Sequence, residues 1–186
     1  LRFPEQRLGG AEPGMEPHLF QIHKETKDWN RILGVVNVGE LNQACLDGGI
    51  GEIIKIAEGF HEKKIAQFAD IVASQRDRVR LVLIAGPSSS GKTTFSKRLM
   101  VQLRVNGLRP IALSTDNYFV GRDQTPLDED GKPDFECLGA VDVPLFNEHL
   151  ERLLAGERVQ VPIYDFFTGN RSNRTETYQL GPNDIL

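Results

Sequence analysis

Apolar residues recur at helical spacing in three stretches between residues 18 and 74. The pattern predicts a helix over 18–33 that ends at Gly34, and a brief helix over 40–46. A long helix is predicted over 50–74, because one stripe of it carries Ile53, Ala57, Phe60, Ile65, Phe68 and Val72. The segment 1–17 is rich in Gly and Pro and has no such period, which predicts an irregular lead-in.

The next segment contains two short apolar runs with a helical pattern between them. The run 81–85 is rich in branched residues and bounded by arginines, which predicts a buried strand. A helix is predicted over 94–103 from the apolar residues Phe95, Leu99 and Leu103. The run 109–116 predicts a second buried strand. A strand, a helix and a strand at this spacing form a βαβ unit, hence a parallel sheet with a right-handed crossover.

The last third of the chain begins with an acidic, turn-forming segment over 121–136, which predicts a solvated loop. A helix is predicted over 144–154. The alternating run 158–166 predicts a strand, which an internal proline assigns to a sheet edge. Residues 175–180 predict another short strand, and 183–186 predict the start of one more.

A glycine-rich loop joins the strand predicted over 81–85 to the following helix. Residues 86–93 read GPSSSGKT and fit the phosphate-binding pattern G-x-x-x-x-G-K-[ST] without a mismatch. The glycines let successive N–H groups converge on an anion, and the helix N-terminus adds its dipole. Lys92 would reach the β- and γ-phosphates, and the Thr93 hydroxyl would be a ligand of Mg²⁺. The predicted nucleotide-binding residues are Gly86, Ser88, Ser89, Ser90, Gly91, Lys92, Thr93 and Thr94.

An acidic residue, Asp116, ends the strand predicted over 109–116. Ligands of an open parallel sheet collect beyond the carboxyl ends of its strands, so Asp116 and the glycine loop should face one cleft. Phosphoryl transfer needs a base that orients the acceptor and a cation at the transferred group. We therefore predict Asp116 as the catalytic base and Lys92 as the catalytic cation. A helix or turn cap and an indirect partner of Mg²⁺ are the open alternatives for Asp116.

These patterns predict an α/β protein of the P-loop NTPase type. Helices should flank a parallel sheet, and a small, mainly helical segment should precede it. We expect three regions, which are an irregular lead-in over 1–17, a helical appendage or linker over 18–79, and a P-loop domain over 80–186.

The composition narrows the class of protein further. The chain has 186 residues, 39% hydrophobic and 26% charged, and a net charge of −4, which favours neither nucleic acid nor a membrane surface as a partner. No apolar run is long enough to span a membrane. Cys45 and Cys137 are expected to be free thiols, which predicts a cytoplasmic location. His61 is expected on a solvated helix face, and His149 is expected to be exposed or at a cap.

Three segments resemble the phosphoribulokinase/uridine kinase family in order and spacing. They are 86–94, 113–119 (LSTDNYF) and 159–166 (VQVPIYDF), and Arg171 follows them. The segment 18–79 resembles the one that precedes the kinase in long bacterial uridine kinase-like proteins. Those proteins carry a threonyl-tRNA synthetase-like region farther upstream, which would explain a chain that starts without methionine.

The resemblance implies a kinase that uses ATP and Mg²⁺ to phosphorylate a hydroxyl of a small molecule, with Asp116 as the base. It also implies that 80–186 is the N-terminal part of a P-loop kinase domain. It implies substrate-binding roles for Tyr118, Phe119, Asp142, Tyr164, Phe166 and Arg171. Two positions depart from the family pattern. Gly139 stands where the family has a ribose-contacting aspartate, and Gly169 stands where it has a histidine. The loss of two polar partners argues against uridine itself as the acceptor.

The leading hypothesis is a kinase that acts on a nucleoside or a sugar-like metabolite. The alternative is a nucleotide-binding regulatory module with a degenerate acceptor site. A GTPase-like switch is disfavoured, because the chain has no guanine-reading Asn-Lys-x-Asp. In the family, an acidic strand end and an arginine-bearing lid would follow Leu186, so we expect the 186-residue chain alone to bind nucleotide weakly and turn over poorly.

Overall fold

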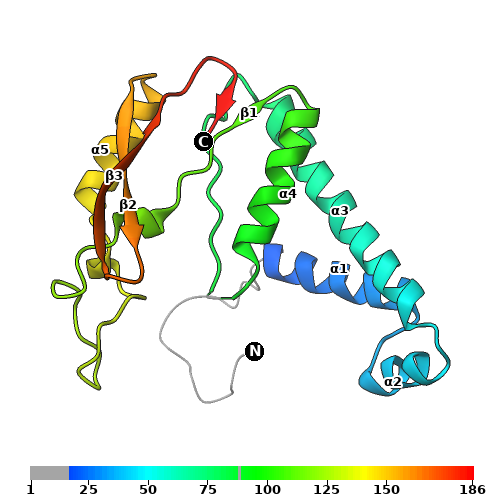
Figure 1. The fold of residues 1–186 in the computed structure, drawn as a ribbon. Coiled ribbons are helices and arrows are strands. Elements are labelled where there is room, and N and C mark those ends of the chain that lie inside the picture. The colour runs from blue at the N-terminus through cyan, green and yellow to red at the C-terminus, as the bar shows by residue number, and fades with distance from the viewer. Residues whose placement is uncertain (1–16, 88) are drawn as a thin grey trace, which may run out of the picture. The chain divides into compact units, whose positions relative to one another are not determined.

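The computed structural model describes residues 17–87 and 89–186 (Figure 1). The chain divides into two compact units, and the boundary falls between Lys64 and Ile65, inside a long helix. Except for its last residue, the lead-in predicted over 1–17 lies outside the described residues, as does Ser88.

The N-terminal unit contains α1 (Pro17–Leu33), α2 (Val38–Leu46) and the first part of α3 (Ile50–Ser74). All three predicted helices are confirmed, and their ends differ from the prediction by two residues at most. The described part of the chain contains no helix with the length and apolar character that crossing a bilayer demands.

Contacts between α1 and α3 hold the N-terminal unit together. The ring of Trp29 stacks on Phe60, with the centroids 5.3 Å apart. The ammonium of Lys64 lies 2.7 Å from a carboxylate oxygen of Glu25. An aromatic stack thus packs the two helices together, and a half-exposed ion pair lies beside it.

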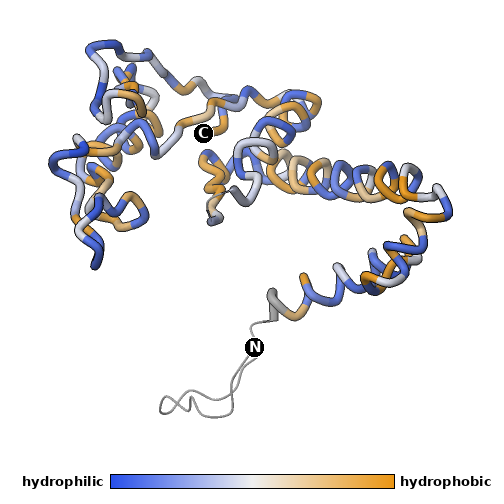
Figure 2. The backbone as a smooth tube through the Cα atoms, turned by 60° about the horizontal axis from the view of Figure 1, so that its bottom comes forward, coloured by the Kyte–Doolittle hydropathy of each residue, from blue (hydrophilic) through white to orange (hydrophobic). Residues whose placement is uncertain are grey.

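The second unit begins with the last turns of α3, which pack on α4 (Lys92–Val105). Figure 2 shows apolar and polar residues alternating along both helices, as expected for helices that bury one face. The ring of Phe68 meets Phe95 edge-on, with the centroids 6.3 Å apart. The buried residues of this core are Ile65, Ala69, Leu99, Leu103, Leu108 and Ile185.

A short parallel ladder brings together three segments far apart in the sequence. Strand β1 (Arg109–Pro110) pairs in parallel with β4 (Asp184–Ile185). The segment of β4 also bonds to residues 80–82, on the side away from β1. The Leu186 N–H donates to the Arg80 carbonyl at 3.0 Å, and the Val82 N–H donates to the Leu186 carbonyl at 2.8 Å. The segment that ends the chain therefore lies between β1 and the segment that leads into the glycine loop. The carboxyl ends of all three point to one edge.

A helix and an antiparallel hairpin form the second core of this unit. The helix is α5 (Val143–Leu154), and the hairpin joins β2 (Val159–Asp165) to β3 (Asn170–Tyr178). Leu81 and Leu113 pack against the same core, which ties the hairpin to the parallel ladder. The buried residues are Tyr118, Leu153, Val159, Val161, Leu180 and Leu186.

The two strands predicted before and after the glycine loop and its helix are shorter in the structure than predicted. Only the start of the run 81–85 takes part in the ladder, and Leu83 is 77% exposed. The run 109–116 is a strand only over β1, and it ends in the 3₁₀ helix η1 (Thr115–Tyr118). A strand needs a neighbour to complete its hydrogen bonds, and within the described residues each run has a neighbour over a short stretch only.

The predicted architecture is otherwise confirmed. The molecule is an α/β protein with a parallel sheet and flanking helices, preceded by a helical segment. The helix predicted over 144–154 and the strand predicted over 158–166 are present. The strand predicted over 175–180 starts earlier, because β3 pairs with β2 directly after a tight turn.

Candidate active site

The glycine loop ends at the start of α4, where no described side chain caps the helix. Gly91 occupies the N-cap position with φ at 88° and ψ at 13°, a left-handed conformation that favours glycine. The first N–H groups of α4 are therefore left for water or a ligand. Together with the dipole of the helix, they suit a phosphate group.

The loop before Gly91 folds tightly on itself. The Ser90 N–H donates to the Pro87 carbonyl at 3.2 Å. A Cβ placed on Gly86 would lie 2.7 Å from the Ser90 hydroxyl oxygen. An alanine at position 86 would thus displace this hydroxyl, so glycine is needed for the close approach.

The side chain of Lys92 lies over the loop. Its ammonium donates to the carbonyl of Gly86 at 2.7 Å and to the carbonyl of Pro87 at 2.8 Å. These bonds hold a positive charge against the same loop whose helix end offers free N–H groups. Thr93 and Thr94 follow in the first turn of α4 and are exposed. The predicted loop residues in the described part of the chain thus lie together.

Asp116 lies in η1, beyond the carboxyl end of β1. The Ser114 hydroxyl accepts the Asp116 N–H at 3.3 Å and so caps this turn. The carboxylate of Asp116 is exposed. Among the described residues it has no hydrogen bond and no ion pair, so it is available to a ligand.

Three of the predicted substrate-binding residues meet in one aromatic cluster. Phe119 contacts Tyr164 and Phe166 with centroid distances of 5.5 and 6.4 Å, and these two rings lie 5.1 Å apart. Phe135, from the loop over 121–136, joins the cluster at 5.7 Å from Phe119. Tyr164 is buried, and its hydroxyl has no partner among the described residues. A buried hydroxyl without a partner is uncommon, and a ligand could supply one.

Tyr118 and His149 form a buried pair beneath this cluster. The Tyr118 hydroxyl lies 3.0 Å from His149 Nδ1, and Tyr118 is fully buried. Burial raises the pKa of Tyr118 to about 12, although Arg171 acts in the opposite direction. Burial also lowers the pKa of His149 below its usual 6.5. The prediction that His149 is exposed or at a cap is wrong, because α5 turns this residue toward the core.

Asp142 and Arg171 form an ion pair next to Tyr118. Asp142 is the N-cap of α5 and accepts the Leu145 N–H at 3.1 Å. Its other oxygen lies 3.1 Å from the Arg171 guanidinium, which also donates to the Tyr118 carbonyl at 3.0 Å. The Nε of Arg171 is buried, and no described residue accepts from it. Arg171 thus has at least one buried donor, the Nε–H, left for a ligand.

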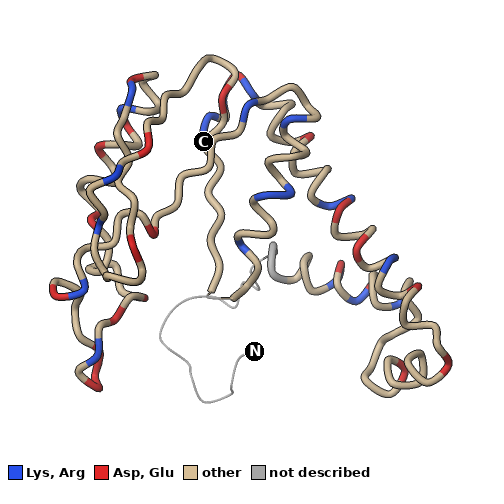
Figure 3. The backbone as a smooth tube through the Cα atoms, viewed as in Figure 1, with Lys and Arg blue, Asp and Glu red and all other residues tan. Residues whose placement is uncertain are grey.

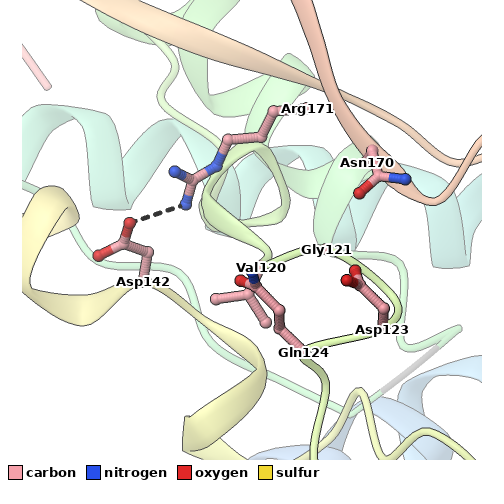
Figure 4. A pocket seen from close by; sticks show the side chains of 7 residues that line it. All are labelled: Val120, Gly121, Asp123, Gln124, Asp142, Asn170 and Arg171. Atoms are coloured by element: carbon pink, nitrogen blue, oxygen red, sulfur yellow. Dashed lines mark hydrogen bonds and ion pairs between the residues drawn. The ribbon is translucent and has the colours of Figure 1, made fainter.

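A cavity of about 340 Å³ opens beside this ion pair (Figure 4). Figure 4 shows Arg171 extending toward Asp142 on one side, while Asn170 and Asp123 lie on the other. A Cβ on Gly121 would lie 2.6 Å from an Asp123 oxygen and 2.7 Å from the Asn170 amide oxygen, so glycine allows both side chains to approach. The cavity is lined by Val120, Gly121, Asp123, Gln124, Asp142, Asn170 and Arg171.

The two departures from the family pattern have different surroundings. A Cβ on Gly139 would lie 2.9 Å from Pro126. A Cβ on Gly169 would lie 2.8 Å from Nε of Arg122, whose guanidinium occupies the space that a side chain there would need. No motif or spacing in the sequence pointed to Arg122. Its only signal was an arginine in a loop otherwise rich in acidic residues.

Acidic and basic residues alternate along the described parts of the chain, and Figure 3 shows them interspersed along the helices and the hairpin. No group of three or more His, Cys, Asp or Glu side chains within 17–87 and 89–186 is arranged to hold a metal ion. Cys45 and Cys137 are free thiols. The candidate site comprises the glycine loop, Asp116 and the aromatic cluster.

The fold and the glycine loop together define a domain of the P-loop NTPase type. The chain belongs to the phosphoribulokinase/uridine kinase family, whose model matches residues 81–186. The family resemblance predicted from three segments is thereby confirmed.

Curated relatives include several bacterial uridine kinases. The chain is 33% identical over 103 residues to the uridine kinase of Leuconostoc citreum and 35% identical over 106 residues to that of Mycoplasma genitalium. These matches cover 55% and 57% of the chain, and 48% of each relative. A uridine kinase of Deinococcus deserti is 34% identical over 103 residues, which cover 55% of the chain and 49% of that protein. The chain thus spans about half the length of the relatives it matches.

Proposed function

We propose that the protein transfers the γ-phosphoryl group of ATP to a hydroxyl of a nucleoside or sugar-like small molecule. The observation that carries this proposal is the uncapped N-terminus of α4 with Lys92 over its loop. At the same edge of the parallel ladder lies a second chemical group, the exposed Asp116 carboxylate. Phosphoryl transfer requires a site that binds phosphate groups and a carboxylate that can act as a base.

The glycine loop would bind the phosphates of ATP. The N–H groups at the start of α4 would donate to phosphate oxygens, and the ammonium of Lys92 would leave its loop carbonyls for the β- and γ-phosphates. The exposed Thr93 hydroxyl is the one described group that we propose as a ligand of Mg²⁺, an ion that would neutralise charge on the transferred group.

The acceptor would bind at the aromatic cluster and the adjoining ion pair. The Asp116 carboxylate accepts the hydroxyl proton as the acceptor oxygen bonds to the γ-phosphorus. The bond from that phosphorus to the β–γ bridging oxygen breaks, and ADP leaves with the electron pair. The proposed acceptor contacts are Phe119, Tyr164, Phe166, Arg171 and Asp142. Tyr118 is fully buried, so we propose that it supports these contacts through its carbonyl rather than touching the acceptor.

Two finer assignments rest on the resemblance and on the cysteines. We propose that the chain belongs among the long bacterial uridine kinase-like proteins with a threonyl-tRNA synthetase-like region. We also propose a cytoplasmic location, where ATP is available and where Cys45 and Cys137 remain reduced.

The test measures ATP consumption by the intact protein against a panel of nucleosides and sugars. We expect turnover with at least one acceptor, and Asp116→Asn should lower kcat by about 10²- to 10⁴-fold while ATP still binds. Asp128→Asn is the matched control. Asp128 lies in an exposed turn, and the substitution keeps the oxygen that accepts two N–H groups there. Unchanged turnover in Asp116→Asn would refute the assignment of the base.

A nucleotide-binding regulatory module is the second candidate. Gly139 and Gly169 favour it, because neither position can supply a polar side chain to an acceptor. ATP binding without turnover on any acceptor of the panel would support this module and contradict the kinase.

A further inference from the structure

The backbone carbonyl of Tyr118 holds both members of the ion pair beside the cavity. The Arg171 guanidinium donates to this carbonyl at 3.0 Å, and the Asp142 N–H donates to it at 2.8 Å. The side chains of Arg171 and Asp142 also bind each other, 3.1 Å apart (Figure 4). Tyr118 lies two positions after Asp116 in η1, and Phe119 follows it. The position of Tyr118 therefore affects the ion pair, the proposed base and the aromatic cluster.

The side chain of Tyr118 is fixed by two residues of α5. The Tyr118 ring is fully buried, and it meets the rings of Phe146 and His149 edge-on, with centroid distances of 5.1 and 5.6 Å. Its hydroxyl lies 3.0 Å from His149 Nδ1 and has no other polar partner among the described residues. A buried hydroxyl needs an acceptor for its proton, so the hydroxyl donates and Nδ1 accepts. The proton of the neutral imidazole is then on Nε2.

Protonation of His149 would break this arrangement. An imidazolium carries a proton on both nitrogens, so Nδ1 could no longer accept from the Tyr118 hydroxyl. Burial holds the pKa of His149 below its usual 6.5, and the charge of Arg171 acts in the same direction. The neutral form, which accepts the bond, is therefore the main form near neutral pH. The charged and titratable groups around the imidazole are Glu148 and Arg152 on α5, Asp142 at its N-cap, Arg171 on β3 and Tyr118 on η1.

We propose that His149 is a positioning residue of the acceptor site, which acts through the Tyr118 hydroxyl on the pair of Asp142 and Arg171. The imidazole fixes the Tyr118 ring, and the ring fixes the backbone carbonyl that holds the guanidinium. This inference rests on the proposed function, because it adds a residue to the same acceptor site. The competing account gives His149 and Tyr118 a structural role only, as part of the core between α5 and the hairpin.

The first test uses nuclear magnetic resonance on the intact protein without substrate. The nitrogen chemical shifts of His149, identified by their loss in His149→Asn, should show the proton on Nε2 near neutral pH. The Arg171 Nε–H signal, identified by its loss in Arg171→Lys, should shift as His149 titrates below pH 6.5. In Tyr118→Phe most of this shift should disappear, because the linking hydroxyl is absent. A proton on Nδ1, or an Arg171 signal that responds equally in Tyr118→Phe, would overturn the proposal.

The second test measures KM for ATP and for an acceptor, with uridine and ribose as the acceptor probes. Tyr118→Phe and His149→Leu should each raise the KM of the acceptor about fivefold, as expected for one neutral hydrogen bond, and leave the KM of ATP unchanged. The double variant should lose no more than either single variant, because both substitutions remove the same bond. Additive losses, or equal rises in both KM values, would overturn the positioning role and favour the structural one.

A conservative variant separates positioning from packing. His149→Asn keeps an oxygen that can accept at the place of Nδ1, and it does not titrate. It should restore the KM of the acceptor near neutral pH and remove the rise in this KM that the wild type shows below pH 6.5. His61→Asn is the control, since His61 is exposed on α3 and should leave the pH profile unchanged. A profile that is the same in His149→Asn and the wild type would contradict the role of His149.

The resonance measurement keeps this inference separate from the proposed function. An Arg171 signal that depends on the Tyr118 hydroxyl, without turnover on any acceptor, would contradict the kinase and support the positioning role. Turnover together with an Arg171 signal that is independent of this hydroxyl would support the kinase and overturn the positioning role.

Discussion

At the scale of single residues, the buried pair of Tyr118 and His149 links the stability of the fold to pH. Burial lowers the pKa of His149, so the folded protein holds its neutral form. The unfolded chain has the ordinary histidine pKa near 6.5. The stabilising contribution is therefore complete above that pH, and it is lost as the pH falls below 6.5 through the lower pKa of the folded state. The charged groups that act on this histidine are Glu148, Arg152, Arg171 and Asp142.

We predict that His149→Gln removes this part of the pH dependence, because a glutamine does not titrate. The measurement is urea unfolding at several values between about pH 7 and pH 5, where the wild type should lose more stability than the variant. His61→Gln is the control, since His61 is exposed on α3 and should leave the pH dependence unchanged. If the wild type and His149→Gln lost equal stability as the pH falls, the proposed effect of the Tyr118–His149 pair on the pH dependence would be contradicted.

Residue positions could be predicted where they depend on neighbours in the sequence. Lys92 and Thr93 follow from a continuous motif, and the structure places them at the start of α4 as its spacing requires. His149 and Arg122 depend on contacts with residues 31 and 44 positions away, Tyr118 and Phe166. A pattern of apolar spacing holds no information about such contacts, so the burial of His149 was predicted wrongly.

At the scale of elements, Asp142 joins α5 to β3. It caps the helix through the Leu145 N–H, and it pairs with Arg171 across to the hairpin. We predict that Asp142→Ala lowers the free energy of unfolding by about 1–3 kcal/mol, because it removes the cap and leaves the partly buried guanidinium without its partner. Asp142→Asn keeps an oxygen for the cap and should cost less. Urea unfolding measures both, and equal losses would show that the cap contributes nothing.

Helices were predicted better than strands, for a physical reason. The bonds of α3 join residues four apart, so its period and its ends are readable from residues 50–74 themselves. The runs 81–85 and 109–116 need partners from elsewhere in the chain. Within the described residues their backbones pair only with the segment 183–186, so most of their length is extended but unpaired.

At the scale of the whole molecule, the parallel ladder depends on contacts across more than half of the chain. Arg80 donates to the carbonyl of Asp184 at 3.2 Å and to that of Gly181 at 3.0 Å, and these residues lie 104 and 101 positions away. The fold class was predictable, since the sequence shows strand, helix and strand in order. The insertion of 184–186 between 80–82 and β1 was not, because three residues, one acidic and two apolar, do not specify their neighbours.

The ladder positions the glycine loop, so nucleotide binding should stabilise this unit as a whole. A non-hydrolysable ATP analogue at about 100 times its Kd should raise the free energy of unfolding of the intact protein by about 2.7 kcal/mol, and it should slow hydrogen exchange at the start of α4. Gly91→Ala should abolish most of this effect, because an alanine at φ 88° is strained and shifts the N–H groups that would bind phosphate.

Gly107→Ala is the matched control for that prediction. Gly107 also has a left-handed backbone, with φ at 80°, and a Cβ there meets no atom within 4 Å. Both substitutions should cost about 1–2 kcal/mol of stability without nucleotide, since the backbone strain is similar. Only Gly91→Ala should lose the stabilisation by the analogue. If the analogue stabilised both variants equally, the phosphates would bind elsewhere than at the start of α4. That result would contradict the phosphate-binding role on which the proposed kinase rests.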